Sequence, residues 1–172
     1  MISSFFKKLL LTRRIEIDNG RFKVFDKDFL LGSLQGFVFL REEMKKQKAI
    51  DVLYKFGEEI SKEIYDYIKK FGGGKEEILR FWLNMVNMSG FGAIEIIEAK
   101  DKELHAVVNC SNSPMAEYYS RTLKKSEAAD EMLAGIIGGF FSQWFEKPVV
   151  CEEIVCMAKG GRYCQFKISP KK

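Results

Sequence analysis

The amino-acid sequence predicts an α+β domain with an antiparallel sheet of about four strands, packed on one side by four or more helices, and an N-terminal β-hairpin. Two observations predict this class. Segments with strand and helix periodicity occur in groups rather than in strict alternation, and short links join strand segments in pairs. We expect a single domain over residues 1–172, because the length suits one core and no linker or repeat interrupts the chain.

The first 90 residues divide into a hairpin region, residues 1–26, and a helical part, residues 27–90. Asn19-Gly20 lies between segments of alternating apolar residues, which is typical of a tight β-hairpin. Apolar residues at helical spacing follow. They predict three helices, over residues 29–46, 49–71 and 75–88.

Residues 91–172 are expected to contain the main sheet, a long helix and a final hairpin. Apolar patterning predicts four strands, over residues 93–98, 104–109, 149–155 and 163–168. Ser113-Pro114 opens a short helical stretch, and a long helix is expected over residues 126–145. The last two strands flank the loop MAKGGR, whose glycines allow the chain to turn back.

Composition and charge narrow the classes of function. The formal net charge is +4, and basic residues are mixed with acidic ones, as on an ordinary solvated surface rather than a nucleic-acid-binding face. No apolar run approaches the roughly 20 residues that span a bilayer, and the start MISSFFKKLLLTRR lacks the features of a signal peptide. We therefore expect a cytoplasmic protein whose four cysteines stay reduced, which favours a metal site over disulfides.

Glu153, Cys156 and Cys164 form a candidate metal cluster near the C-terminus. Two thiolates and a carboxylate are ligands that zinc accepts. Residues three apart on a regular strand point to opposite faces, so this site requires a bulge or a strand end near Val155. The alternative is that Cys156 and Cys164 are buried apolar thiols paired across two strands.

The segment from Asn112 to Phe166 resembles the 4-vinyl reductase domain family. This family consists of small α+β modules, found alone or in the sensor regions of aromatic-responsive transcription activators. The resemblance covers about a third of the chain, in matching order and spacing. It is carried by Asn112-Ser113-Pro114, Ala116-Glu117-Tyr118, LAGIIGGFFSQWF, Pro148-Val149-Val150, Glu153, Cys156, Gly160 and Tyr163-Cys164-Gln165-Phe166.

The resemblance implies a zinc site with four protein ligands. Its last three ligands correspond to Glu153, Cys156 and Cys164, and the first corresponds to Asp130, where the family often has cysteine. Aspartate can bind zinc through oxygen, and we expect it to bind more weakly than the cysteine thiolate would. The alternative for Asp130 is an acid placed at the start of the long helix by the helix dipole, and Cys151 is the reserve ligand. Four protein ligands leave no coordination position open for water or substrate, so the zinc would be structural.

One face of the long helix consists of small residues, and this requires a reason. Ala134, Gly138 and Ser142 follow one another at steps of four, and Gly135 and Gly139 lie beside them. Each glycine costs about 1 kcal/mol relative to alanine inside a helix. Either the helix packs closely against another element, including one across a dimer interface, or the small face makes room for a ligand.

The resemblance also implies an apolar cavity for a small aromatic or hydrocarbon-like ligand. Residues of this kind are more often plain core, so the same set is also consistent with a packed interior. The candidate lining residues are Phe91, Ile94, His105, Val107, Tyr118, Tyr119, Phe140, Trp144 and Phe166.

Together these features predict a non-catalytic sensor module: a homodimer that binds an apolar small molecule, carries a structural zinc and passes its signal to a downstream regulator protein. The first alternative is an enzyme that reduces a tetrapyrrole vinyl group, although the sequence has no nicotinamide or flavin fingerprint. The second is a protein-interaction scaffold, because the family fold is similar to that of vesicle-tethering complex subunits.

Overall fold

The structure is a computed structural model that describes residues 11–12, 14–18, 21–24, 27–30, 32–70 and 73–171. The chain divides into two compact units, Met1–Phe37 and Val38–Lys172, and each is described by itself. The expectation of a single domain remains a prediction.

The N-terminal unit contains a three-stranded antiparallel sheet in the order β1-β2-β3. Its strands are β1 (Ile15–Asp18), β2 (Arg21–Val24) and β3 (Lys27–Phe29). The pairing of β1 with β2 confirms the predicted hairpin, whereas its Asn19-Gly20 turn falls outside the described residues.

β3 occupies the position where the sequence predicted the beginning of a helix, so helix α2 (Leu34–Lys46) begins five residues later than expected. Two cross-strand contacts account for the strand. The rings of Phe22 and Phe29 meet with centroids 6.3 Å apart, and Arg21 forms an ion pair with Asp28. Such pairs stabilise a hairpin in a way that periodicity within one segment does not reveal.

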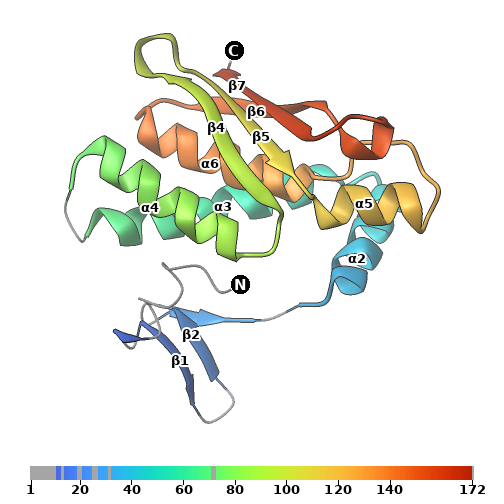
Figure 1. Ribbon diagram of the computed structural model, residues 1–172, viewed down its shortest axis with the longest axis horizontal. Coiled ribbons are helices and arrows are strands. Elements are labelled where there is room, and N and C mark those ends of the chain that lie inside the picture. The colour runs from blue at the N-terminus through green and yellow to red at the C-terminus, as the bar shows by residue number, and fades with distance from the viewer. Residues whose placement is uncertain are drawn as a thin grey trace. The chain divides into compact units, whose positions relative to one another are not determined.

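The C-terminal unit contains a four-stranded antiparallel sheet in the order β4-β5-β7-β6, which confirms the predicted α+β class. Its elements are α3 (Asp51–Lys69), α4 (Lys75–Met88), β4 (Ala93–Lys100), β5 (His105–Ser111), α5 (Pro114–Arg121), α6 (Glu131–Trp144), β6 (Val149–Val155) and β7 (Cys164–Pro170). Helices α3, α4 and α6 lie on one side of this sheet, as predicted (Figure 1).

Helix α6 is the centre of the core, because it contacts both the sheet and α3. Every residue from Leu133 to Phe141 is buried. The Phe140 ring stacks on Trp82 of α4 with centroids 4.1 Å apart, and Phe141 packs edge-on against Trp144 at 5.9 Å. These four rings form the ring cluster between α4 and α6.

The small face of α6 packs directly on the backbone of α3. A Cβ atom added at Gly135 would lie 2.0 Å from the carbonyl oxygen of Tyr54, and one at Gly139 would lie 2.7 Å from that of Glu58. The approach is reciprocal, because a Cβ at Gly57 of α3 would lie 2.2 Å from the carbonyl oxygen of Met132. Close helix packing therefore accounts for this face, and the partner is α3.

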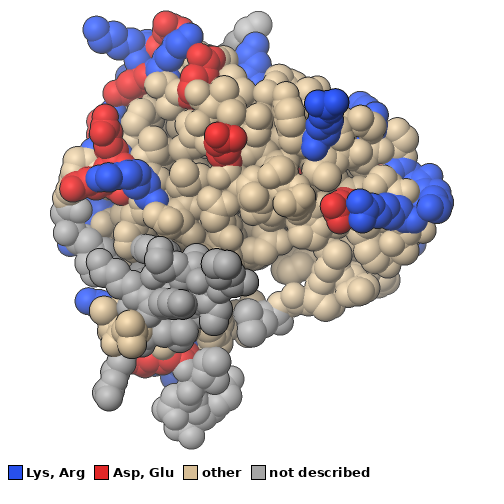
Figure 2. Space-filling view, viewed as in Figure 1, with Lys and Arg blue, Asp and Glu red and all other residues tan. Residues whose placement is uncertain are grey.

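The surface agrees with the mild net charge. In the view of Figure 2, basic side chains lie interspersed with acidic ones around a largely uncharged face. Among the described residues, no helix combines the length and the apolar character needed to cross a membrane.

We expect Gly135→Ala to lower the free energy of unfolding by about 2 kcal/mol, because the new methyl group would overlap a backbone carbonyl that cannot move aside. The matched control is Gly36→Ala in α2, where the nearest atom to an added Cβ is the Ser33 hydroxyl oxygen at 3.4 Å. This control should leave stability unchanged or raise it by up to about 1 kcal/mol. Urea unfolding followed by circular dichroism measures both, and equal effects would contradict the close approach.

Candidate metal centre

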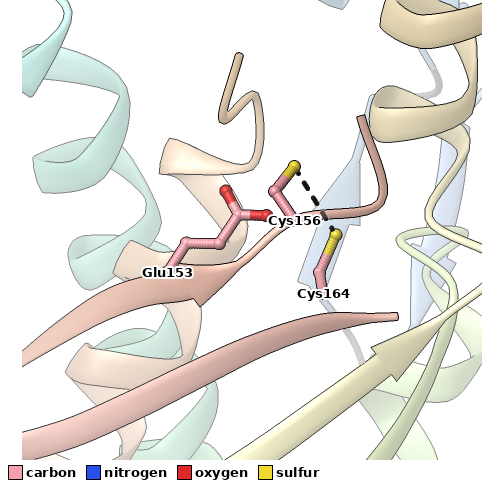
Figure 3. A group of neighbouring side chains, drawn as sticks. All are labelled: Glu153, Cys156 and Cys164. Carbon is pink, nitrogen blue, oxygen red and sulfur yellow. Dashed lines mark hydrogen bonds between the residues drawn. The ribbon is translucent and has the colours of Figure 1, made fainter. Parts of the chain in front are cut away.

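A β-bulge at the end of β6 brings Glu153 and Cys156 to the same side of the strand. Glu153 pairs with Phe166 and Val155 pairs with Gln165, so three residues of β6 lie opposite two of β7. The extra residue shifts the alternation of side chains by one. The bulge that the sequence required near Val155 is therefore present, and Figure 3 shows Glu153 directed toward the two cysteines.

The hairpin tip returns Cys164 to Cys156. A short 3-10 turn, Met157–Lys159, ends at Gly160, whose φ of +92° is a left-handed conformation that glycine adopts without strain. Cys164 then begins β7, and its Sγ lies 3.9 Å from Sγ of Cys156 (Figure 3). The ligand atoms of Glu153, Cys156 and Cys164 all lie within 4.8 Å of one another.

Asp130 is not one of these three residues, but it contacts the group through Cys164. It is the residue before α6, its side chain makes no capping hydrogen bond, and it is only 3% exposed. The Cys164 thiol donates to Asp130 Oδ2 over 3.4 Å, and the buried Ser113 hydroxyl donates to the same oxygen over 2.8 Å. The carboxylate therefore points into the cluster rather than along the helix.

Burial and mutual repulsion perturb the titration of these groups. Burial, reinforced by the negative charge of Glu153, raises the pKa of Asp130 to about 7. Burial likewise raises the pKa of Glu153 to about 8. A hydrogen bond from Cys164 lowers the pKa of Cys156 to about 6, and the same bond, followed by burial, raises the pKa of the Cys164 thiol. Four acidic groups in one buried place are the arrangement that a divalent cation would neutralise.

Two separations between donor atoms match the edges of a tetrahedral zinc site. Bond lengths of about 2.3 Å to sulfur and about 2.0–2.2 Å to oxygen imply a sulfur–sulfur edge near roughly 3.8 Å and a sulfur–oxygen edge near roughly 3.6 Å. The separations here are 3.9 Å between the two Sγ atoms and 3.4 Å from Cys164 Sγ to Asp130 Oδ2. Glu153 Oε1 is buried and has no hydrogen-bond partner in the described part of the chain, which leaves it available as a ligand.

The other two cysteines have different surroundings. Cys151, the reserve ligand, lies in the middle of β6 opposite Ile168, and burial raises its pKa well above the ordinary value. Cys110 lies on β5 directly opposite Cys164, and burial raises its pKa to about 12. The three-ligand group described above includes neither thiol.

The structure brings together some of the expected pocket residues. Phe140 and Trp144 belong to the ring cluster, and Ile94 and Phe166 are buried on the face of the sheet that the helices cover. Tyr119 of α5 is fully buried, and its hydroxyl donates to Glu42 of α2.

Four further candidates lie apart from the ring cluster or at its edge. Val107 and His105 alternate with the buried Ala106 and Val108 along β5, so they lie on the opposite face of the sheet. His105 Nε2 is 2.8 Å from a Glu98 carboxylate oxygen. Phe91 and Tyr118 are half-buried, before β4 and on α5 respectively.

Sequence reasoning missed two residues that shape the centre. Ser113 belongs to the motif that carried the family resemblance, yet its contact with Asp130 could not be read from local spacing. Arg41 begins a polar run on α2, and its partners lie close to 90 residues further along the chain. Ordinary surface lysines and arginines give the same local signal, so only the folded chain distinguishes Arg41.

Comparison with known proteins gives matches in both sequence and structure. Residues 107–170 match the model of the V-4-R (vinyl-4-reductase) domain family. An uncharacterised protein from Methanocaldococcus jannaschii is 29% identical over 132 residues, a region covering 73% of this chain. The match spans about three fifths of that relative, 61% of its length.

Three solved structures share the fold. The phenol-responsive sensory domain of the transcription activator PoxR with phenol aligns with a TM-score of 0.80 at 15% identity, covering 98% of this chain and 92% of that one. A vinyl-4-reductase family protein from Methanocaldococcus jannaschii aligns at 0.57 with 23% identity, covering 84% and 85%.

The third is a trafficking protein particle complex subunit 3 from Naegleria fowleri, covalently bound to palmitic acid. It aligns at 0.53 with 15% identity, covering 80% of this chain and 92% of that one. At these identities the likeness concerns the fold. Together with the family-model match over residues 107–170, it confirms the resemblance that was read from the sequence.

Proposed function

We propose that this protein is a small-molecule-binding sensor module that holds a structural zinc and acts as a homodimer. The observation that carries the sensor role is the similarity of nearly the whole chain to a sensory domain that responds to phenol. The four free thiols suit a reducing compartment such as the cytoplasm.

The ligand we propose is a small apolar or aromatic molecule bound beside the ring cluster. Trp82, Phe140, Phe141 and Trp144 gather there between α4 and α6. A mostly apolar site with a few polar groups is typical of small-molecule binding. The Trp144 indole N–H, which donates to the Lys75 carbonyl over 3.0 Å, is one polar group at its edge.

The zinc we propose is held by Asp130, Glu153, Cys156 and Cys164. Its support is the closeness of the Glu153, Cys156 and Cys164 donor atoms, the 3.4 Å contact between Cys164 Sγ and Asp130 Oδ2, and the unpartnered buried oxygen of Glu153. The ion would bind the start of α6, the end of β6 and the start of β7 together, and it would neutralise their buried acids. With four protein ligands it would have no open position for chemistry.

The homodimer we propose uses the outer face of α3. Val52 and Phe56 lie one helical turn apart and are 44% and 49% exposed. Large apolar side chains exposed side by side favour contact with another protein surface. A second copy of the chain supplies an identical apolar stripe, which is the self-complementarity that a two-fold dimer requires.

Purified without chelator, the protein should contain one zinc per chain, measured by elemental analysis and chelator competition. Cys164→Ser should lose the metal, whereas Cys151→Ala removes a thiol outside the group and should retain it. Asp130→Cys should bind zinc at least about tenfold more tightly, because thiolate is the softer ligand. Equal zinc content in wild type and Cys164→Ser would exclude this site.

Phenol should change the tryptophan fluorescence saturably, because both tryptophans of the chain belong to the ring cluster. Phe141→Leu keeps the site apolar but removes a ring, and we expect it to weaken phenol binding about fivefold. Tyr163→Leu, at the tip of the last hairpin and 36% exposed, is the control and should bind as the wild type does. A response that grows linearly with phenol in all three proteins would contradict the proposed location.

Light scattering coupled to size exclusion should give the mass of a dimer for the wild type. Phe56→Glu should shift it to the monomer, because a buried unpaired charge opposes the interface. Ile97→Glu places the same charge on β4 at a side chain that is 51% exposed, and it should remain a dimer. A monomeric wild type, or identical behaviour of the two variants, would rule out this interface.

A further inference from the structure

Arg41 of α2 forms hydrogen bonds with the chain on both sides of Asp130. Its side chain is 3% exposed. Its Nε donates to Glu131 Oε2 over 2.7 Å, and its Nη2 donates to the other oxygen of that carboxylate and to the carbonyl of Ala128. Glu131 follows Asp130 directly and Ala128 precedes it by two residues. One planar guanidinium therefore fixes the short segment that directs Asp130 into the cluster.

The same guanidinium reaches the neighbourhood of a second ligand. Arg41 Nη1 lies 3.5 Å from Glu127 Oε1, and Lys45, one turn further along α2, forms an ion pair with the same carboxylate. Sγ of Cys156 lies 3.8 Å from the backbone carbonyl oxygen of Glu127. Contacts from α2 thus extend to within one residue of Asp130 and to the partner of Cys156.

A third set of contacts holds Arg41 itself. The guanidinium carbon lies 4.6 Å from the centre of the Tyr119 ring, and the Tyr119 hydroxyl donates to Glu42, the residue next to Arg41. Tyr119 belongs to α5, the helix that begins after Ser113, and the Ser113 hydroxyl donates to Asp130. The network is therefore closed: α2, α5 and the start of α6 hold one another, and Asp130 lies at their junction.

A lysine could not replace this arrangement. The guanidinium presents a rigid fork of donors that contacts a carboxylate through two nitrogens and a carbonyl at once, whereas an ammonium is a single point charge. Removing one member of a buried charged network leaves the others unpaired. Partners that orient metal ligands commonly change metal affinity by about 10–100-fold when they are removed.

We infer that Arg41 is a positioning residue for the metal centre and that it couples occupation of the centre to the docking of α2. This inference rests on the zinc site proposed above. Metal binding would fix the position of Asp130 and, with it, residues 128–131. Because Arg41 forms hydrogen bonds with this segment, α2 would be fixed as well. Because such coupling is reciprocal, loosening α2 lowers zinc affinity, and removing zinc loosens α2.

The first measurement is zinc affinity by chelator competition on the full chain. We expect Arg41→Met and Arg41→Lys each to bind zinc at least about tenfold more weakly than the wild type. Lys46→Met removes an exposed ion pair with Glu43 from the same helix and should bind normally. Val86→Ala creates a small cavity in α4, away from the centre, and controls for lost stability alone.

Two further readouts separate positioning from general destabilisation. The ligand-field spectrum of bound Co²⁺ should change in Arg41→Met, because Asp130 no longer holds its place, and remain unchanged in Val86→Ala. Hydrogen exchange should show that zinc slows the amides of residues 38–46 in the wild type. That protection should disappear in Arg41→Met even when the zinc is saturating.

The outcomes are distinct. A wild type that binds no zinc overturns the metal centre and this coupling together. A wild type that binds zinc, with unchanged affinity and cobalt spectrum in Arg41→Met, overturns the coupling alone. Protection by zinc that is confined to residues 127–130 and 153–164, with no effect on α2, overturns it as well. Equal losses of zinc affinity in Arg41→Met and Val86→Ala would show that Arg41 contributes only to stability, and they would overturn the coupling.

Discussion

The contact between the backbones of α3 and α6 is the constraint on which the rest of the C-terminal unit depends. Gly57 on one helix and Gly135 and Gly139 on the other remove the side chains that would keep the helices apart. The short distance places α6 between α3 and the sheet, with its whole central part buried. The opposite side of α6 is then free to present large rings to α4.

The position of α6 also determines where the candidate metal centre forms. Asp130 directly precedes the first turn of this helix, so the position of α6 in the core determines the position of Asp130. The bulge in β6 and the turn at Gly160 bring Glu153, Cys156 and Cys164 to the same place from the sheet. The candidate centre is therefore a junction of elements that are close in space and separated in sequence.

The buried charges of α2 have a different role from the apolar core. A well-packed apolar residue in place of a buried ion pair is often equally stable, so stability alone does not explain Arg41. Its hydrogen bonds are directional and go to Glu131 and Ala128, on the two sides of Asp130. An ion pair at 3.5 Å goes to Glu127, whose carbonyl faces Cys156. A directional network suits a part of the molecule where small changes in geometry change the binding of a ligand.

The sequence by itself determined the fold class, the order of the main helices and strands, and the three residues of the candidate metal group. These features rest on local signals: periodicity, turn residues, the spacing of Glu153, Cys156 and Cys164, and the motif around Asn112. Even the bulge near Val155 followed from the sequence, because a metal cannot be shared by side chains on opposite faces of a regular strand.

Only the tertiary structure decided which faces meet. Periodicity predicted α3 but not its buried face: the apolar Val52 and Phe56 are exposed, while Gly57 and Ser61 are buried. The reason is that the side of α3 facing α6 must carry small residues, because the two backbones lie so close together. The pattern of one helix does not reveal how closely a second helix approaches it. The same holds for Arg41, β3 and the Ser113–Asp130 hydrogen bond, each of which depends on a partner that no local pattern contains.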